Sequence, residues 1–155
     1  MILDELLEFA DAAAVAGSAG TALLGDVIDL ETAGLNPGCG EPIYCVMSVD
    51  TEVITGGNAG TIQYSLVSDA QAAIAVDGTA TVHFNTESIV TDGTDANGEK
   101  CKATAIIAAF CLPSGSYERY LGVLVTIGTT AVTAGKVNAF LTKDVAAWKA
   151  YADAL

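Results

Sequence analysis

Apolar and polar residues alternate with a period of two along much of this chain, and an amphipathic helix cannot accommodate that pattern. The clearest case runs from Ile43 to Val49, where every second side chain is apolar. The alternation recurs in residues 61–68, 121–127 and 137–141, and more weakly in residues 22–30 and 79–85. The apolar residues on these faces form the predicted core: Ile43, Cys45, Met47, Val49, Ile62, Tyr64, Leu66, Val123, Val125 and Ile127.

Turn-forming residues separate the predicted strands. Residues 34–40 contain Asn-Pro-Gly, residues 56–60 contain Gly-Gly-Asn, and residues 112–116 contain Pro-Ser-Gly. About seven or eight short strands without helices between them indicate an all-β sandwich or barrel rather than an α/β fold. Residues 103–112 are apolar on both faces, which predicts a central strand that is covered on both sides.

The two ends of the chain lack this alternation. Residues 1–15 carry apolar side chains at helical spacing with carboxylates between them, which predicts a short amphipathic helix or a docking arm. Residues 16–155 show no internal domain boundary and are expected to form a single β-sandwich domain. Residues 145–155 could close this domain as a helical tail.

The charge balance excludes several classes of partner. The chain has 6 Lys and Arg against 19 Asp and Glu, a net charge of −13, and residues 1–99 contain no Lys or Arg. We therefore expect no binding to nucleic acid or to anionic membranes, because both need cations on the protein. The longest uncharged runs are 16 residues, shorter than a membrane span, and the acidic N-terminus does not fit a signal peptide. We expect a protein that is assembled in the cytoplasm and attracted to basic partners.

No motif in the sequence predicts catalysis or a cofactor. The four cysteines fit no metal-binding spacing and are expected to be buried or half-buried. His83, the one histidine, is predicted to lie at the surface or in a subunit contact. The acidic loop 91–99 does not match the calcium-loop spacing and is expected to be a solvated hairpin, with weak calcium binding left open. We therefore expect a protein that is not an enzyme.

Several ordered segments resemble the capsid cement proteins of tailed bacteriophages, of the kind found on a Bordetella phage. They are Met1–Asp11 with Ala14-Val15, Val27–Leu30, Gly38–Tyr44, Arg119–Leu121 with Gly128, and Thr133–Val137 with Leu141 and Asp144. The segment Gly38-Cys39-Gly40-Glu41-Pro42-Ile43-Tyr44 is similar to that family's Gly-x-Gly-Glu-Pro-hydrophobic-Tyr. Residues 56–102 depart most from the family pattern. The resemblance therefore says less about the contacts of the loops in this region than about the fold.

The resemblance implies a jelly-roll β-sandwich on the capsid exterior that bridges subunits of the major capsid protein and stabilises the head. Its expected partners are the major capsid protein and further copies of itself, as a dimer or trimer. The candidate interface residues are Ile2, Leu3, Leu6, Leu7, Phe9, Glu41, Tyr117, Arg119 and Tyr120. The alternative is a tail- or fibre-associated adhesion module, for which Tyr117 and Tyr120 are the one close pair of aromatic residues expected to face outward.

Overall fold

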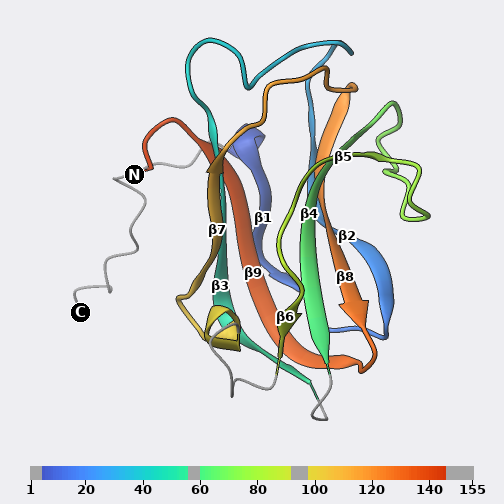
Figure 1. Ribbon diagram of the computed structural model, residues 1–155, viewed down its shortest axis with the longest axis vertical. Coiled ribbons are helices and arrows are strands. Elements are labelled where there is room, and N and C mark those ends of the chain that lie inside the picture. Colours follow the sequence, from blue (N-terminus) through green and yellow to red (C-terminus); the bar gives the residue numbers. More distant parts are fainter. Residues whose placement is uncertain (1–4, 56–59, 92–97, 146–155) are drawn as a thin grey trace.

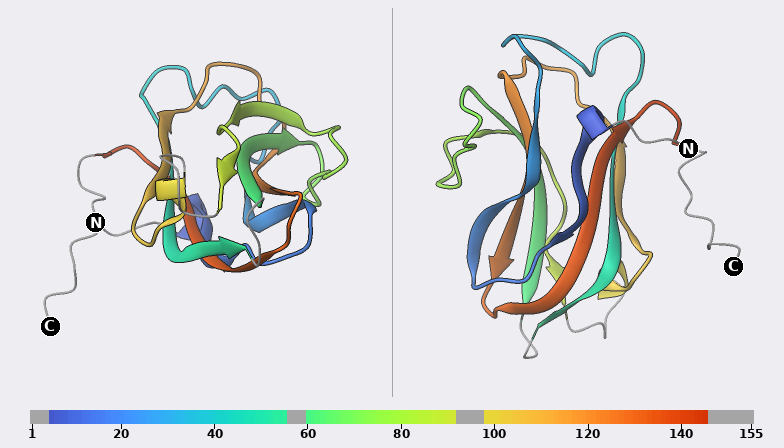
Figure 2. Two further views of the ribbon diagram at one scale, coloured as in Figure 1. Left: turned by 60° about the horizontal axis from the view of Figure 1, so that its bottom comes forward. Right: turned by 180° about the vertical axis from the view of Figure 1, so that it is seen from behind.

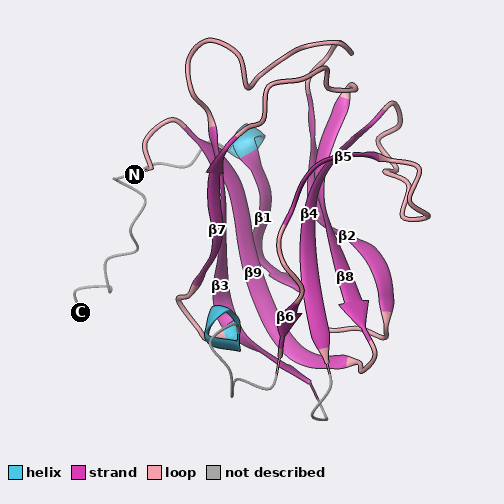
Figure 3. Ribbon diagram, viewed as in Figure 1, coloured by secondary structure: helices cyan, strands magenta, loops and turns pink. Residues whose placement is uncertain are grey.

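The computed structural model describes residues 5–55, 60–91 and 98–145, and within them nine β-strands form two facing sheets (Figures 1 and 3). The strands are β1 (Glu8–Ala14), β2 (Gly20–Asp29), β3 (Tyr44–Thr55), β4 (Thr61–Asp69), β5 (Thr81–Asn85), β6 (Ile89–Val90), β7 (Ile106–Cys111), β8 (Tyr120–Gly128) and β9 (Val132–Thr142). Two short 3-10 helices, η1 (Glu5–Leu7) and η2 (Gly98–Cys101), complete the described elements.

The strand order is that of a jelly roll. One sheet has the order β1-β9-β3-β7, and the other has the order β2-β8-β4-β5 with β6 also paired to β4. All strand pairs are antiparallel. The first strand therefore lies beside the last, and the chain crosses repeatedly from one sheet to the other. This confirms the prediction of an all-β antiparallel sandwich.

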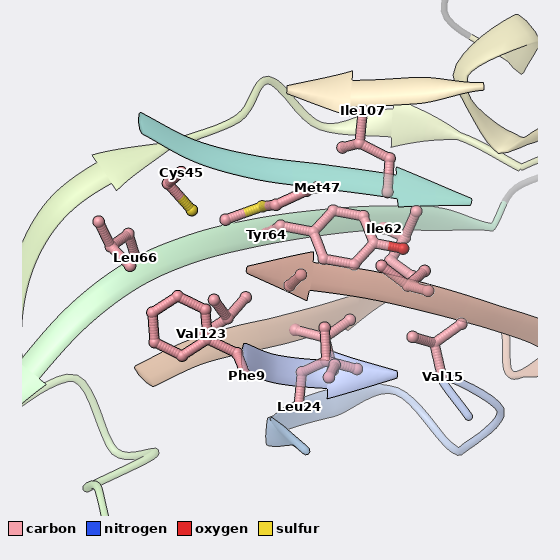
Figure 4. Packing of buried hydrophobic residues seen from close by; sticks show 14 of the residues in the cluster. Phe9, Val15, Leu24, Cys45, Met47, Ile62, Tyr64, Leu66, Ile107 and Val123 are labelled. Carbon is pink, nitrogen blue, oxygen red and sulfur yellow. The ribbon is translucent and has the colours of Figure 1, made fainter. Parts of the chain in front are cut away.

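The residues that the alternation selected lie in the space between the sheets, together with other buried residues such as Phe9 of β1, Leu24 of β2 and Ile107 of β7 (Figure 4). Nine of the ten predicted core residues are buried, and the tenth, Ile43, is half-buried and packs against them. A smaller cluster lies on the outer face of the second sheet, where Ile74 and Ala80 from the β4–β5 connection cover Val67 and Leu124. The outer face of that sheet is thus partly covered by the protein's own loop.

Tyr64 brings one unsatisfied polar atom into the core. Its side chain is almost fully buried, and its hydroxyl has no hydrogen-bond partner within the described part of the chain. Burial raises the pKa of this phenol, so the hydroxyl stays protonated. A buried hydroxyl without a partner loses its hydrogen bonds to water and gains none in return.

We expect Tyr64→Phe to raise the free energy of unfolding by about 1 kcal/mol, because it removes the unsatisfied hydroxyl and keeps the ring. Tyr117→Phe is the matched control, since the Tyr117 hydroxyl donates to the Pro113 carbonyl at 2.7 Å. The control should lower the free energy of unfolding by about 1 kcal/mol. Urea unfolding of both variants measures the difference, and equal losses would mean that Tyr64 has a hydrogen-bond partner in solution.

The helix predicted for residues 1–15 is wrong over most of its described part. Only η1 is helical, while β1 pairs with the edge of β9 and buries Phe9 and Ala10. A helix of this length is marginal in water, whereas the edge of β9 offers backbone hydrogen bonds and the sandwich offers a core to pack on. Residues 146–155 of the expected helical tail lie outside the described residues.

The central position predicted for residues 103–112 is also wrong. β7 is an edge strand that pairs only with β3, and Ile106 is 48% exposed. The register shifts between Met47 and Ser48, opposite residues 106–108, so a bulge interrupts the alternation there. Ile107 and Phe110 consequently both pack toward the core although they are three residues apart. The bulge, and not burial of both faces, accounts for Ile107 and Phe110 in the core, whereas Ile106 and Ala109 are apolar although they are exposed.

Candidate interaction surfaces

The predicted N-terminal interface residues do not share one environment. Leu6 and Leu7 in η1 are 79% and 41% exposed, whereas Phe9 is 1% exposed and belongs to the core. Phe9 therefore cannot contact a partner without leaving the sandwich, which corrects its assignment to an interface. Ile2 and Leu3 lie outside the described residues. Leu6 and Leu7 remain as exposed apolar side chains beside the first strand.

An acidic groove runs along the side of the sandwich where β1 and β2 lie next to each other. Figure 2 (right) shows the course of these two strands. It has a volume of about 500 Å³, and four carboxylates line it: Glu5, Glu8, Asp11 and Asp26. Partial burial raises the pKa of Glu8, and the neighbouring carboxylates of Asp11 and Glu5 raise it further. The described lining includes no Lys or Arg. The acidic groove is therefore a site of concentrated negative potential.

A glycine brings the two strands close enough to form this groove. Gly25 has a φ of +64°, and the pairing of β2 with β8 shifts register between Leu24 and Ile28. A Cβ atom at Gly25 would lie 2.0 Å from the Phe9 carbonyl oxygen, so β2 contacts the β1 backbone directly. Asp26 follows Gly25 and joins the carboxylates of β1. No local sequence signal indicated Asp26, because β1 and β2 belong to different sheets.

Arg119 and Glu41 are engaged in ion pairs within the chain. Arg119 donates from Nε and Nη2 to the two carboxylate oxygens of Asp29, at 2.9 and 2.8 Å, and its guanidinium lies 5.0 Å from the centre of the Tyr120 ring. The hydrogen bond from Arg119 lowers the pKa of Asp29. Lys143 Nζ donates to Glu41 Oε2 at 2.6 Å. Arg119 thus joins the end of β2 to the start of β8 and stays partly exposed beside Tyr120.

Tyr117 does not face outward. Its side chain is 1% exposed, and its ring stacks on His83 at 3.8 Å between centroids with 12° between the ring planes. The backbone around it pairs with Leu35, which fixes the loop before β8 against the loop that precedes β3. The prediction that Tyr117 and Tyr120 form an outward aromatic pair is therefore wrong.

His83 forms a hydrogen-bonded contact within the sandwich and is only partly exposed. The Ser68 hydroxyl lies 2.8 Å from His83 Nε2 and accepts a hydrogen bond from the Glu118 amide at 3.1 Å. Burial lowers the pKa of His83, although the nearby Glu118 carboxylate opposes this shift. Ser68 is fully buried, so its hydroxyl has no access to a substrate. The pair links β4, β5 and the approach to β8.

Metal-ligating clusters and membrane-spanning helices were considered for the described part of the chain. There, no group of three or more His, Cys, Asp and Glu side chains is placed to hold a metal ion. Residues 92–97 of the acidic loop lie outside that part. No helix among the described residues is long and apolar enough to cross a bilayer. Cys45 and Cys101 are buried as predicted, whereas Cys39 and Cys111 are exposed, contrary to the prediction.

Comparison with known families gives one match that spans the sandwich. The family model Bbp16 matches residues 9–141, which run from the second residue of β1 to the penultimate residue of β9. No curated protein matches the sequence. The matched region includes all or nearly all of each described strand, the groove-forming Gly25 and the ion pair of Arg119 with Asp29.

Proposed function

The chain belongs to the Bbp16 family of Bordetella phage proteins, and we propose that it is a structural virion protein that cements the phage head. In this role it binds the outer surface of the assembled capsid, bridges subunits of the major capsid protein and has no enzymatic activity. Membership of a phage protein family over nearly the whole sandwich carries the proposal. The resemblance of the segments around Glu41 and Arg119 to cement proteins supports it.

A cement protein stabilises the capsid by mass action, and the packing and the charge of this sandwich favour such binding. A protein that binds the assembled shell better than the free subunits stabilises the shell by that difference in binding free energy. The jelly roll already has a continuous buried core, so docking does not require it to fold and little conformational entropy is lost. Its net charge of −13 favours approach to a basic surface.

The acidic groove and the neighbouring η1 helix form the candidate contact with the capsid. The groove offers four carboxylates without an internal cation among the described lining residues, and Leu6 and Leu7 add exposed apolar area beside it. A basic patch on the major capsid protein with an apolar centre would complement this combination. Deletion of residues 1–11 is a poor test of this contact, since it would also remove Phe9 from the core.

We expect the protein to be present in purified virions at a copy number comparable to that of the major capsid protein, and to cosediment with empty capsids. Quantitative mass spectrometry of purified particles measures the first expectation, and a pelleting assay measures the second. Absence of the protein from mature particles would contradict the proposed function.

Charge-neutralising variants test which surface docks. The variant with Glu8→Gln and Asp11→Asn should bind capsids several-fold more weakly, with a smaller difference at high salt. The matched control replaces two exposed carboxylates outside the groove, as Glu31→Gln with Asp50→Asn, and should bind like the wild-type protein. Equal binding by all three proteins would exclude the acidic groove as the contact and would leave the virion result unaffected.

The alternative role is an adhesion module of a tail or fibre. It was favoured by an outward-facing pair of tyrosines, Tyr117 and Tyr120, which the structure does not contain. Sugar-binding surfaces use exposed aromatic rings as platforms, and Tyr117 is buried against His83. Tyr120 lies under the Arg119 guanidinium. A pull-down on immobilised glycans distinguishes this role from capsid binding, because a cement protein should not be retained.

A further inference from the structure

The loop between β7 and β8, residues 112–119, is held to the second sheet through one histidine. His83 of β5 stacks on the Tyr117 ring of this loop, and its Nε2 lies 2.8 Å from the Ser68 hydroxyl of β4. The Glu118 amide of the loop donates to the same hydroxyl at 3.1 Å. His83 therefore contacts the loop directly through its ring and indirectly through Ser68.

The hydrogen bonds of Ser68 determine which form of His83 fits this contact. A hydroxyl has one hydrogen to donate, and the Glu118 amide already uses Ser68 Oγ as an acceptor. When His83 is neutral with its proton on Nδ1, Nε2 accepts the Ser68 hydrogen. A proton on Nε2 makes this atom a donor, so the hydrogen of the fully buried Ser68 loses its acceptor. The contact therefore favours the neutral imidazole.

The groups that face His83 from the neighbouring elements act in opposite directions. The ring is half-buried, and this burial lowers the pKa of His83, while the Glu118 carboxylate opposes the shift. Glu118 is the one charged group of the described chain with a resolved effect on the ring. β4 presents the neutral Ser68 hydroxyl, and the loop presents the Tyr117 phenol, whose pKa burial raises to about 12. The net direction is downward, so the folded protein disfavours a proton on the ring.

The contact at His83 also positions a second loop at the same end of the sandwich (Figure 1). The Gly34 amide donates to the Tyr117 carbonyl at 2.7 Å, and the Tyr117 amide donates to the Leu35 carbonyl at 3.0 Å. These bonds join the loop before β8 to the loop that precedes β3. The two loops carry the exposed residues Arg119 and Glu41. A change at His83 therefore affects both loops.

We propose that His83 is a proton-sensitive latch: the neutral imidazole holds residues 112–119 to β4 and β5, and a proton from solvent on Nε2 releases this loop together with the loop before β3. The open state exposes the ring and restores the usual histidine pKa of about 6.5. The free energy of opening is therefore highest above pH 6.5, falls as the pH decreases below that value, and levels off below the lowered pKa of the closed state.

An NMR titration of the purified free protein measures the latch, because His83 is the one histidine in the chain. The C–H signals of its ring should titrate with a midpoint below about 6.5. Ser68→Ala should raise this midpoint by about 0.5–1 pH unit, since it removes the hydrogen bond that favours the neutral ring. Ser65→Ala is the matched control, because Ser65 is a buried serine of the same strand that does not bond to His83, and it should leave the midpoint unchanged.

Amide hydrogen exchange measures the release of the loops. From about pH 7.5 to about pH 5, the protection factors of the Gly34 and Tyr117 amides should fall ~3–10-fold relative to those of the central strands β3 and β8. His83→Gln cannot bind a proton, so the relative protection of these amides should be equal at both pH values.

Three results would each overturn the proposal: a histidine midpoint at or above about 6.5 in the wild-type protein, equal midpoints in Ser68→Ala and Ser65→Ala, or loop protection that does not depend on pH in the wild-type protein. The same loss of protection in His83→Gln as in the wild-type protein would also overturn it. The wild-type and serine measurements stand if His83→Gln does not fold. None of these experiments involves the capsid, so their outcome is independent of the proposed function.

Discussion

We expect Val125→Asp to abolish folding. Val125 is 4% exposed in β8, which lies between β2 and β4 in its sheet. Its neighbours across the two strand pairs are Ala22 and Tyr64, and its side chain belongs to the main core. A carboxylate at this position has no cation to pair with and no path to water, so its burial costs several kcal/mol. That cost is comparable to the whole stability of a domain of this size, about 5–15 kcal/mol.

Circular dichroism and thermal melting of the purified variant measure this outcome. Val76→Asp is the matched control, because it makes the same substitution at a valine that is 47% exposed. The control should be soluble and should melt within a few degrees of the wild-type protein. If Val125→Asp were soluble and melted cooperatively, residue 125 would have to face solvent, and the register of β8 would be different.

The core could be predicted from sequence because alternation is a local property. Once β4 is a strand, Ile62, Tyr64 and Leu66 must share one face, whichever strands are its neighbours. The same reasoning selected Val123 and Val125 in β8, and all five residues are buried. Neither the pairing partners nor the number of layers enters this inference, so it does not depend on knowing the topology.

Where the prediction was wrong, the structure of the residue or strand is determined by contacts with segments that are distant in the sequence. β1 is a strand because β9 is available to it, and the Ala12 amide donates to the Asn138 side chain 126 residues away. β7 appears central in the sequence because its bulge turns Ile107 and Phe110 toward the same core. Tyr117 was predicted to be exposed, but it is buried and His83 from β5 stacks on its ring. Local patterns carry no information on these partners.

The acidic groove was predictable only in part, for the same reason. Glu5, Glu8 and Asp11 are close in the sequence, so an acidic N-terminal segment was evident. Asp26 joins them because the second sheet packs its edge against β1, and Gly25 allows that approach. The shape of the groove therefore depends on one backbone position that no charge pattern could indicate.

We expect Gly25→Ala to lower the free energy of unfolding by about 2–5 kcal/mol. Two effects add. An L residue at a φ of +64° costs about 1–2 kcal/mol, and overpacking costs about 1–3 kcal/mol more. The overpacking arises because the new Cβ would lie 2.0 Å from the Phe9 carbonyl oxygen and 3.1 Å from the Ala10 Cβ. The first of these atoms is backbone, so it can yield only if β1 and β2 move apart.

Gly34→Ala separates the two effects. Gly34 has a φ of +84°, and a Cβ there would meet nothing within 4 Å, so only the backbone strain applies. Its cost should be about 1–2 kcal/mol, and the effect of alanine on the entropy of the unfolded chain is the same at both positions. Urea unfolding compares the two variants, and equal losses would mean that β2 does not contact β1 at Gly25. If instead Gly25→Ala is the more destabilised and also binds capsids more weakly than Gly34→Ala, close packing of β1 on β2 shapes the acidic groove as well as the fold.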